Sequence, residues 1–406
     1  MTAGPLPLDS APRPTRPTES RKLDLVAGTT PDGATPGTGP RKDALSHGAF
    51  LAQRRFASLN GLRSLAILEV IWHHASERGG RAWAVGVGVD LSFAISGFLI
   101  TTLLVREFRR TGRIDVRRFY LRRTLRIFPL YFVVLGTYVL LVLGTLRGTP
   151  EGTAFMHHLA AYSTYTQNWF VPLNPTRETV FFFSWSLATQ EQFYLLWPLV
   201  LALWLAPGRW WRAGAFALAL IALGQIALHA IVVHDFLLRV VRSIAIPICL
   251  GALWSLVLHS PRGFAVARRV LGPRVVALAL LAGVVASFVI VAPFGITECL
   301  IGALVAACCI REDTFAAPLL TVRPFRFIGT ISYGMYLLHM FAVNAVRHVV
   351  GRRLGPIVFV PATTVTLAMS YASYRWFEMP ILRYRDRVHR SKIEAIAPAT
   401  VTESTG

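Results

Sequence analysis

The feature that most limits the fold of this chain is a succession of apolar stretches, each close to membrane-spanning length. A helix needs about 17 to 25 mainly apolar residues to cross the hydrocarbon layer, and hydrophobic residues make up 54% of the 406. Backbone groups in lipid must be hydrogen-bonded within each segment, and the stretches lack the alternation of barrel strands. The sequence therefore predicts an all-α, polytopic membrane helix bundle and excludes an ordinary soluble domain.

We expect about ten transmembrane helices, or eleven if the ambiguous segment 155–183 also crosses. The expected helices span about 59–77, 83–105, 127–146, 184–206, 212–233, 240–258, 275–292, 294–310, 327–349 and 356–377. Treating 155–183 as an external or interfacial segment leaves the later arginine-rich loops and the basic segment Arg383 to Lys392 in the cytoplasm. The positive-inside rule favours this arrangement, which also places both termini in the cytoplasm.

Both ends of the chain differ in composition from its centre. Residues 1–52 are rich in Pro, Thr, Gly and Ser and are expected to be a disordered cytoplasmic tail. Residues 53–385 form the expected membrane domain, and 386–406 a second disordered cytoplasmic tail. The net charge of +21 lies mainly in short basic segments beside apolar runs, which indicates membrane topology rather than nucleic-acid binding.

Ionisable side chains in the first apolar stretch are the strongest functional signal. Arg63 and His74 are eleven residues apart, which at about 100° per residue brings them within about 20° of one helix face. His73 points about 80° away and lies four residues after Glu69, so a local Glu69 to His73 contact is available. Charged groups at membrane depth are costly and usually functional, but an interhelical packing role for His74 is the alternative.

Further polar residues fall at useful depths in the expected bundle. The second helix runs antiparallel to the first, so Asp90 lies at a depth similar to that of His74, where a carboxylate would orient the imidazole. A local capping role for Asp90 is the alternative. The fourth helix carries Gln190, Glu191 and Tyr194, a patch too polar for lipid that should face a cavity.

Nine arginines lie between Arg106 and Arg126. Topology alone explains arginines at the inner membrane surface. Their number, and the nearby Tyr131, also suit an anionic phosphorylated ligand, because guanidinium groups bind phosphate oxygens through paired hydrogen bonds. Both interpretations stay open at this point.

Five sequence blocks, together with the Arg63 to His74 spacing, resemble the acyltransferase 3 family of integral membrane acyltransferases over about residues 56–385. The blocks are GVDLSFAISGFLIT from Gly88, FYLRRTLRIFPLY from Phe119, WSLATQEQFYLLWP from Trp185, FIGTISYGMYLLH from Phe327 and YRWFEMP from Tyr374. Two positions depart from the family pattern: Asn60 replaces an aspartate and Gln190 the first acidic residue of the fourth-helix block. The esterase-like domain fused to some relatives is also absent, so we expect direct transfer to an acceptor or a separate partner protein.

The resemblance implies transfer of an acyl group, usually acetyl, from cytoplasmic acyl-CoA to a hydroxyl of a surface polysaccharide or glycolipid. In that reading His74 acts as general base or carries the acyl group, and Arg63 positions the donor or offsets developing negative charge. The residues expected to support the reaction are Asp90, Glu191, Tyr194 and Ser96. The residues expected to bind the donor are Arg122, Arg123, Arg126 and Tyr131. No metal is expected.

The resemblance also implies a multi-pass protein of the bacterial inner membrane, with the lipid bilayer, acyl-CoA, the saccharide acceptor and other envelope polysaccharide biosynthesis proteins as partners. Three alternatives remain. One is an acyltransferase of a small secreted product such as a macrolide. Another is a proton-coupled secondary transporter, against which the absence of an inverted repeat argues. The third is a non-catalytic component of an envelope polysaccharide system.

Overall fold

The computed structural model describes residues 46–76, 86–171, 180–205, 208–229, 236–290, 292, 295–351 and 355–384. These residues fall within one compact unit of the chain. They form helices, turns and short connections, and no β-strand occurs among them. The predicted all-α class is therefore confirmed for the described part of the chain.

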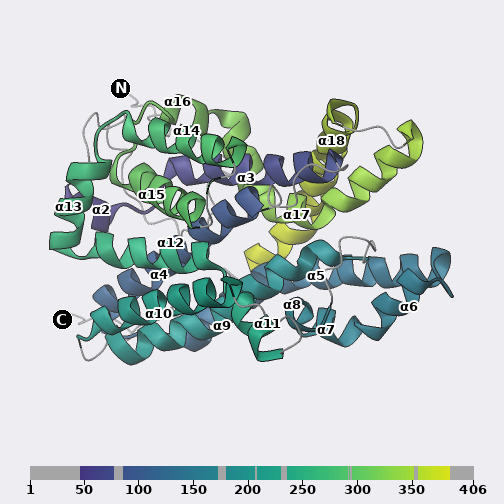
Figure 1. Ribbon diagram of the computed structural model, residues 1–406, viewed down its shortest axis with the longest axis horizontal. Coiled ribbons are helices and arrows are strands. Elements are labelled where there is room, and N and C mark those ends of the chain that lie inside the picture. The colour runs from purple at the N-terminus through teal and green to yellow at the C-terminus, as the bar shows by residue number, and fades with distance from the viewer. Residues whose placement is uncertain are drawn as a thin grey trace, which may run out of the picture. The chain divides into compact units, whose positions relative to one another are not determined.

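The described helices are arranged as in Figure 1. In chain order they are α2 (His47–Ala52), α3 (Ala57–Ala75), α4 (Val87–Thr111), α5 (Val116–Thr145), α6 (Pro150–His157), α7 (Leu159–Ser163), α8 (Gln167–Phe170), η3 (Phe182–Ser184), α9 (Trp185–Leu205), α10 (Trp210–His229), α11 (Phe236–Arg242), α12 (Ile246–His259), α13 (Pro261–Leu271), α14 (Val276–Val289), α15 (Ile296–Ile310), α16 (Ala317–Leu320), α17 (Arg323–Val350), α18 (Pro356–Ser373) and the π-helical turn η4 (Tyr374–Glu378).

Each of the ten expected membrane segments overlaps one helix of at least 14 residues: α3, α4, α5, α9, α10, α12, α14, α15, α17 and α18. By length and composition, however, only four described helices qualify as membrane spans, or six if two sharply bent helix pairs each count as one. The short helices α12, α14 and α15 have 14, 14 and 15 residues. A count of about ten membrane-spanning helices therefore stays a prediction.

The largest boundary difference concerns α5, which begins at Val116 rather than near residue 127. The Asp115 side chain accepts a hydrogen bond from the Arg118 backbone N–H at 2.9 Å and so caps the helix. The arginines from Arg117 to Arg126 therefore belong to the first part of a 30-residue helix and not to a loop, while Arg106 to Arg110 belong to the end of α4. Arginines at successive turns of one helix project at fixed positions, which bears on the site below.

The ambiguous segment 155–183 forms only short helices where it is described. The helices α6, α7 and α8 contain 8, 5 and 4 residues, too few to cross a bilayer. Residues 172–179 lie outside the described part. The observed lengths favour the interpretation of this segment as an external or interfacial region.

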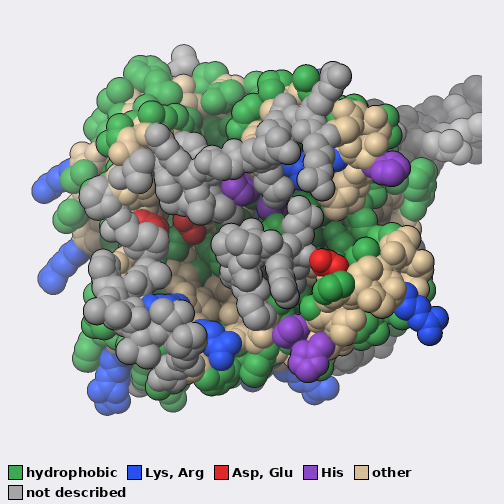
Figure 2. Space-filling view, turned by 45° about the vertical axis from the view of Figure 1, so that its right-hand side comes forward, with side chains coloured by type: hydrophobic (Ala, Val, Ile, Leu, Met, Phe, Trp, Pro, Cys, Tyr) green, Lys and Arg blue, Asp and Glu red, His purple; other side chains and the backbone are tan. Residues whose placement is uncertain are grey.

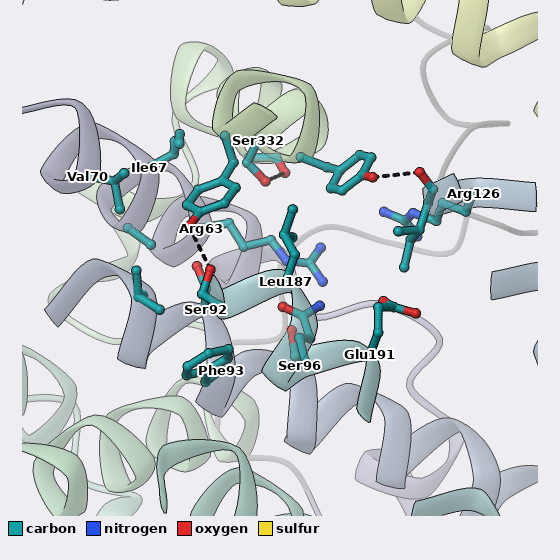
Figure 3. Close-up of a pocket in the computed structure, with 18 of the residues that line it drawn as sticks. Arg63, Ile67, Val70, Ser92, Phe93, Ser96, Arg126, Leu187, Glu191 and Ser332 are labelled. Atoms are coloured by element: carbon teal, nitrogen blue, oxygen red, sulfur yellow. Dashed lines mark hydrogen bonds between the residues drawn. The ribbon is translucent and has the colours of Figure 1, made fainter. Parts of the chain in front are cut away.

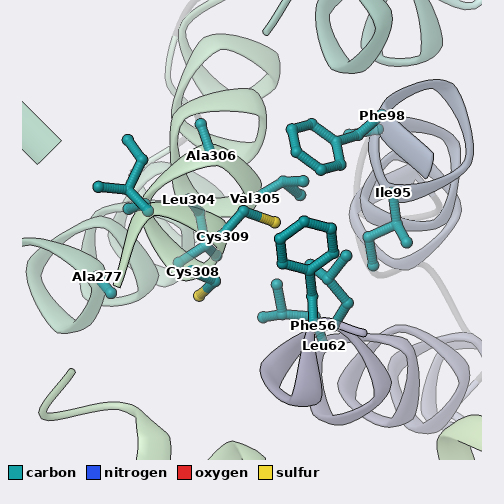
Figure 4. Packing of buried hydrophobic residues seen from close by; sticks show 14 of the residues in the cluster. Phe56, Leu62, Ile95, Phe98, Ala277, Leu304, Val305, Ala306, Cys308 and Cys309 are labelled. Carbon is teal, nitrogen blue, oxygen red and sulfur yellow. The ribbon is translucent and has the colours of Figure 1, made fainter. Parts of the chain in front are cut away.

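The helix pair α4 and α12 packs at very short range through two glycines. A Cβ atom on Gly97 would overlap the carbonyl oxygen of Ile248, and one on Gly251 would overlap that of Ala94. Small residues allow such close approach and are a common device for joining helices in membranes. Next to this contact, the buried core of α3, α4 and α15 includes Phe56, Phe98 and Cys309 (Figure 4).

Large apolar side chains cover the exterior of several helices. Leu140 on α5 and Ile226 on α10 are 73% and 69% exposed, and many other leucines and valines are exposed as well. Figure 2 shows hydrophobic side chains spread over the described part of one face. Such extensive apolar exposure is unusual for a soluble monomer and is what a lipid-facing surface requires.

The short helix α2 lies inside the tail that was expected to be disordered. Phe50 is fully buried, and the Arg106 guanidinium donates to the carbonyl oxygens of Phe50, at 2.8 Å, and of Gln53. The same guanidinium lies 5.6 Å and 5.4 Å from the ring centroids of Phe50 and Phe56. Residues 47–52 of the expected tail 1–52 are therefore helical rather than disordered. Residues 1–45 of that tail and the expected C-terminal tail 386–406 lie outside the described residues, and the domain boundary at residue 53 stays a prediction.

Candidate active site

A cavity of about 130 Å³ opens among α3, α4, α5, α9 and α17 (Figure 3). Its polar lining residues are Arg63, Ser92, Ser96, Arg123, Arg126, Ser186, Gln190, Glu191, Thr330, Ser332, Tyr333 and Tyr336. In Figure 3 Arg63 reaches across the middle of the cavity, with Val70 on one side and Arg126 and Glu191 on the other. We call this space the arginine cavity.

Three arginines give the arginine cavity its positive charge. The guanidinium groups of Arg126 and Arg123 lie close enough to that of Arg63 for their positive charges to repel it. The Arg123 guanidinium lies 3.9 Å from the ring centroid of Tyr194, and the Tyr194 hydroxyl accepts a hydrogen bond from Gln190 Nε2 at 2.5 Å. Stacking on an aromatic ring orients a guanidinium while leaving its edge free for an anionic ligand.

Glu191 lies beside this cluster and interacts electrostatically with Arg123. It lines the arginine cavity, as the sequence predicted for the polar patch of the fourth helix. Ser96 also lines the cavity, whereas Tyr194 acts from beneath Arg123. These three residues therefore lie together around the predicted donor-binding arginines.

His74 lies in the last turn of α3 and is buried. Its ring centroid is 5.1 Å from that of His339 and 5.5 Å from that of Phe182. Arg347 donates a hydrogen bond to the backbone carbonyl oxygen of His74 at 2.6 Å. A cation at this position satisfies a carbonyl that the end of a helix leaves without an intrahelical partner, and it fixes the last turn of α3 against α17.

A second, smaller cavity of about 20 Å³ lies at His74. It is lined by Val70, His73, His74, Val89, Phe182, Phe183, Trp185 and Tyr336. We call it the histidine chamber. Arg63 lines the arginine cavity and His74 the histidine chamber, while Val70 between them on α3 lines both. The helix face predicted to carry Arg63 and His74 is thus the cavity-lining face of α3.

The structure shows further neighbours for the two carboxylates considered near His73 and His74. Asp90 was predicted to lie at a depth similar to that of His74, and the carboxylates of Glu298 and Glu69 are close enough to it to interact electrostatically. Glu69 Oε2 accepts a hydrogen bond from the Gly88 backbone N–H at 3.0 Å. Orientation of the His74 imidazole by Asp90 stays a prediction.

Two of the four predicted donor-binding residues lie elsewhere. Arg123 and Arg126 line the arginine cavity, whereas Arg122 does not. Tyr131 is fully buried, stacks on Tyr165 with ring centroids 4.3 Å apart, and donates its hydroxyl to the carbonyl of Tyr162 at 2.7 Å. These contacts join α5 to the segment that follows it, and a contact of Tyr131 with the donor stays a prediction.

Several cavity residues were not among the predicted site residues. Ser92 precedes Ser96 by four residues, which is the spacing of one helix face, so the pair was recognisable. Ser186 and Tyr336 come from different helices, and their hydroxyls lie 2.6 Å apart. His339 of α17 is distant from His74 in the sequence, and only the fold brings the two rings together. Among the described residues, no group of three or more His, Cys, Asp or Glu side chains could hold a metal ion.

Comparison with known proteins places the chain among the acyltransferases. A family described as "Acyltransferase domain" matches residues 56–375. The chain belongs to this family. The match covers α3 to the π-helical turn η4 and therefore includes every helix that lines the two cavities. The resemblance predicted from the sequence blocks is confirmed.

Curated relatives are named as O-acetyltransferases. The O-acetyltransferase OatA of Staphylococcus aureus is 28% identical over 361 residues, which is 81% of this chain and 57% of OatA. A Bacillus subtilis protein named "Putative peptidoglycan O-acetyltransferase YrhL" is 28% identical over 365 residues, 81% of this chain and 55% of that protein. This chain thus spans little more than half the length of these relatives. No solved structure matches the chain.

Proposed function

We propose that this chain is a membrane-bound O-acetyltransferase that moves an acetyl group from cytoplasmic acyl-CoA to a hydroxyl of peptidoglycan or another exported saccharide. The observation that carries the proposal is the succession of two cavities along α3, one lined by three arginines and the other by His74. An anionic donor needs the positive charge of the arginines, and the acceptor hydroxyl needs a base such as His74. The family match and the names of the relatives favour this enzyme over a transporter or an assembly component.

The donor is expected to bind in the arginine cavity. Acyl-CoA carries several phosphate charges, and the guanidinium groups of Arg63, Arg123 and Arg126 attract them across a cavity partly closed to water. The arginines near the start of α5 lie on the proposed cytoplasmic side, because a long basic segment marks the inner membrane surface. Both termini are cytoplasmic in this proposal.

The acyl transfer step is assigned to His74. Its imidazole removes the proton from the acceptor hydroxyl, the hydroxyl oxygen attacks the thioester carbonyl carbon, and the C–S bond breaks with release of CoA thiolate. In the alternative two-stage transfer, a ring nitrogen of His74 attacks the carbonyl carbon, so that a C–N bond forms as the C–S bond breaks and CoA thiolate leaves. The acceptor hydroxyl oxygen then attacks the acyl-histidine and loses its proton, and the C–N bond breaks with release of the His74 ring. Arg63 either positions the donor phosphates or offsets the negative charge that develops on the carbonyl oxygen.

The proposal is tested with the purified full chain in proteoliposomes. Acetyl-CoA is supplied on one side and a chitooligosaccharide on the other, and O-acetylated sugar is measured by mass spectrometry. We expect ester formation by the wild type and a loss of about 100-fold or more in His74→Gln, because a general base contributes that much. His157→Ala serves as the matched control, since His157 is exposed on α6 and lines neither cavity. Unchanged transfer by folded His74→Gln contradicts the role of His74.

A second measurement addresses the acceptor. Deletion of the gene is expected to lower the O-acetyl content of cell-wall saccharides, which mild base releases for chromatography. A deletion that leaves wall esters intact but removes an ester from a small secreted product assigns the acceptor to that product instead.

A further inference from the structure

The arginine cavity and the histidine chamber share three lining residues, Val70 of α3, Val89 of α4 and Tyr336 of α17. We call these three residues the neck. The two cavities therefore adjoin at these side chains, and a group that moves directly from one cavity to the other moves past them. The neck thus occupies the boundary between a space of about 130 Å³ and one of about 20 Å³.

The valines of the neck lie where α3 and α4 are tied together. Glu69 and Gly88, their immediate neighbours in the chain, form the hydrogen bond between Gly88 N–H and Glu69 Oε2 at 3.0 Å. A Cβ atom on Gly88 would overlap the carbonyl oxygen of Ala66, so the two helices are already in closest contact at this point. Val70 and Val89 are only 5% and 7% exposed. The valine side of the neck therefore has little freedom to widen.

Tyr336 is fixed on the opposite side. Its hydroxyl oxygen lies 2.6 Å from both Ser186 Oγ and the carbonyl oxygen of Phe183. Because the carbonyl can only accept, the tyrosine O–H donates to Phe183 and the serine hydroxyl donates to the tyrosine oxygen. Two hydrogen bonds at one hydroxyl hold the ring across the passage between the two cavities.

The histidine chamber itself is very small. A cavity needs about 10 to 15 Å³ on the same scale to hold one water molecule, so the chamber's 20 Å³ accepts one or two groups of that size. Its other walls include the bulky rings of Phe182, Phe183 and Trp185. The methyl and carbonyl of an acetyl group match this space, whereas each further methylene has to displace packed side chains.

We propose that the neck, Val70, Val89 and Tyr336, is a filter for acyl-chain length that admits acetyl to His74 and excludes longer acyl groups. The inference rests on the proposed function and adds to it the class of donor: short, unbranched acyl thioesters. Val70 and Val89 are then specificity-determining residues that act by volume alone.

The test compares kcat/KM for acetyl-CoA, butyryl-CoA and hexanoyl-CoA with the chitooligosaccharide acceptor. Wild type is expected to lose about 100-fold or more from acetyl to butyryl, because butyryl has two further methylenes and each one that does not fit costs about 10-fold or more. Val89→Ala and Val70→Ala are expected to raise the butyryl-to-acetyl ratio by about 10-fold. Val134→Ala removes the same atoms from an equally buried valine of α5 that lines neither cavity, and its ratio should equal that of wild type.

The possible outcomes distinguish failure of the filter from failure of the proposed function. A wild-type enzyme that transfers hexanoyl as well as acetyl overturns the filter, and this result needs no variant to fold. Unchanged ratios in folded Val89→Ala and Val70→Ala overturn it as well, while the acetyl activity of wild type still supports the proposed function. If Val134→Ala raises the butyryl-to-acetyl ratio as much as the neck variants do, the effect comes from general loosening of the helix packing, and the filter is again overturned. Absence of transfer from every acyl-CoA overturns the proposed function, and the filter with it.

Discussion

The imidazole of His339 packs against the imidazole of His74 with their ring centroids 5.1 Å apart and their planes inclined by 37°. His339 Nδ1 lies 2.5 Å from the carbonyl oxygen of Tyr336. A carbonyl only accepts, so this contact assigns the proton of a neutral His339 ring to Nδ1 and leaves a lone pair on Nε2. His339 Nε2 is buried and has no hydrogen-bond partner among the described residues.

The first prediction follows from this pairing. His339→Phe keeps a ring of similar size against His74 but removes the Nε2 lone pair. We expect kcat for acetyl transfer to fall about 10- to 100-fold with KM for acetyl-CoA nearly unchanged, because misplacement of a reacting group costs rate rather than donor binding. Steady-state kinetics of the reconstituted protein measure both constants. A full rate in His339→Phe would mean that only the ring volume at this position matters.

Adjacent arginines on α5 provide a matched pair for donor binding. Arg123 lines the arginine cavity and Arg122 does not, although both belong to the same helical turn. Arg123→Gln is expected to raise KM for acetyl-CoA about 10-fold, since a hydrogen bond to a charged group contributes about 1.5 to 3 kcal/mol. Arg122→Gln should leave KM within about twofold of wild type. Equal effects of the two variants would trace donor affinity to overall positive charge at the inner surface.

Two helical glycines, Gly97 and Gly136, differ in how closely they are packed, so the same substitution at both measures the effect of close packing on stability. Gly97→Ala forces a methyl group into the backbone of α12, whereas a Cβ on Gly136 of α5 meets nothing within 4 Å. We expect Gly97→Ala to lower the apparent melting temperature or abolish folding, and Gly136→Ala to be neutral or stabilising by up to about 1 kcal/mol. Fluorescence-detected gel filtration after heating measures both. A wild-type melting temperature in Gly97→Ala would show that α4 and α12 can separate at little cost.

The connection after α15 carries an ion cluster whose strength depends on pH. Partial burial alone would raise the pKa of Asp313, but hydrogen bonds from Arg311 at 2.7 Å and Arg274 at 2.8 Å outweigh it and hold the pKa below its usual range. The stabilisation is fully present above the unfolded pKa of about 3.9 and is lost as pH falls through the lowered folded pKa.

Asp313→Asn is therefore expected to destabilise the protein at pH 7 by about 1 kcal/mol or less, because the group is partly exposed to solvent. Thermal unfolding of wild type and variant should converge as the pH falls below 4. A difference that persists at low pH would assign the effect to packing of the side chain instead of its charge.

Sequence periodicity was sufficient to predict features whose geometry is determined within a single helix. The eleven-residue spacing of Arg63 and His74 predicted their common face, because helical geometry fixes directions around one axis. Apolar run length located the ten helices of at least 14 residues, although only four to six of the described spans are long and apolar enough to cross a membrane. The start of α5 was missed because the arginines after Asp115 reduce the apolar signal, although an aspartate before a helix is a recognisable cap.

Features set between helices could not be predicted in this way. Topology predicts a depth for Asp90, but which side of α4 faces α3 depends on close contacts such as that of Gly88 with Ala66. The sequence predicted that Tyr131 binds phosphate, and only the structure shows that its ring stacks on that of Tyr165, a residue outside its own helix. His339 and Tyr336 likewise gained their significance only from packing of α17 against α3.

The helix α2 offers a practical reporter of the state of this protein. A segment of six residues has no helical stability of its own, so its order depends on Arg106 and on the pocket that receives Phe50. Loss of amide-exchange protection at residues 47–52, or new protease cleavage there, would be an early sign that the end of the bundle carrying Arg106 has loosened. The same property makes residues up to 45 a suitable place for attaching an affinity tag or fluorophore, with α2 left intact behind it.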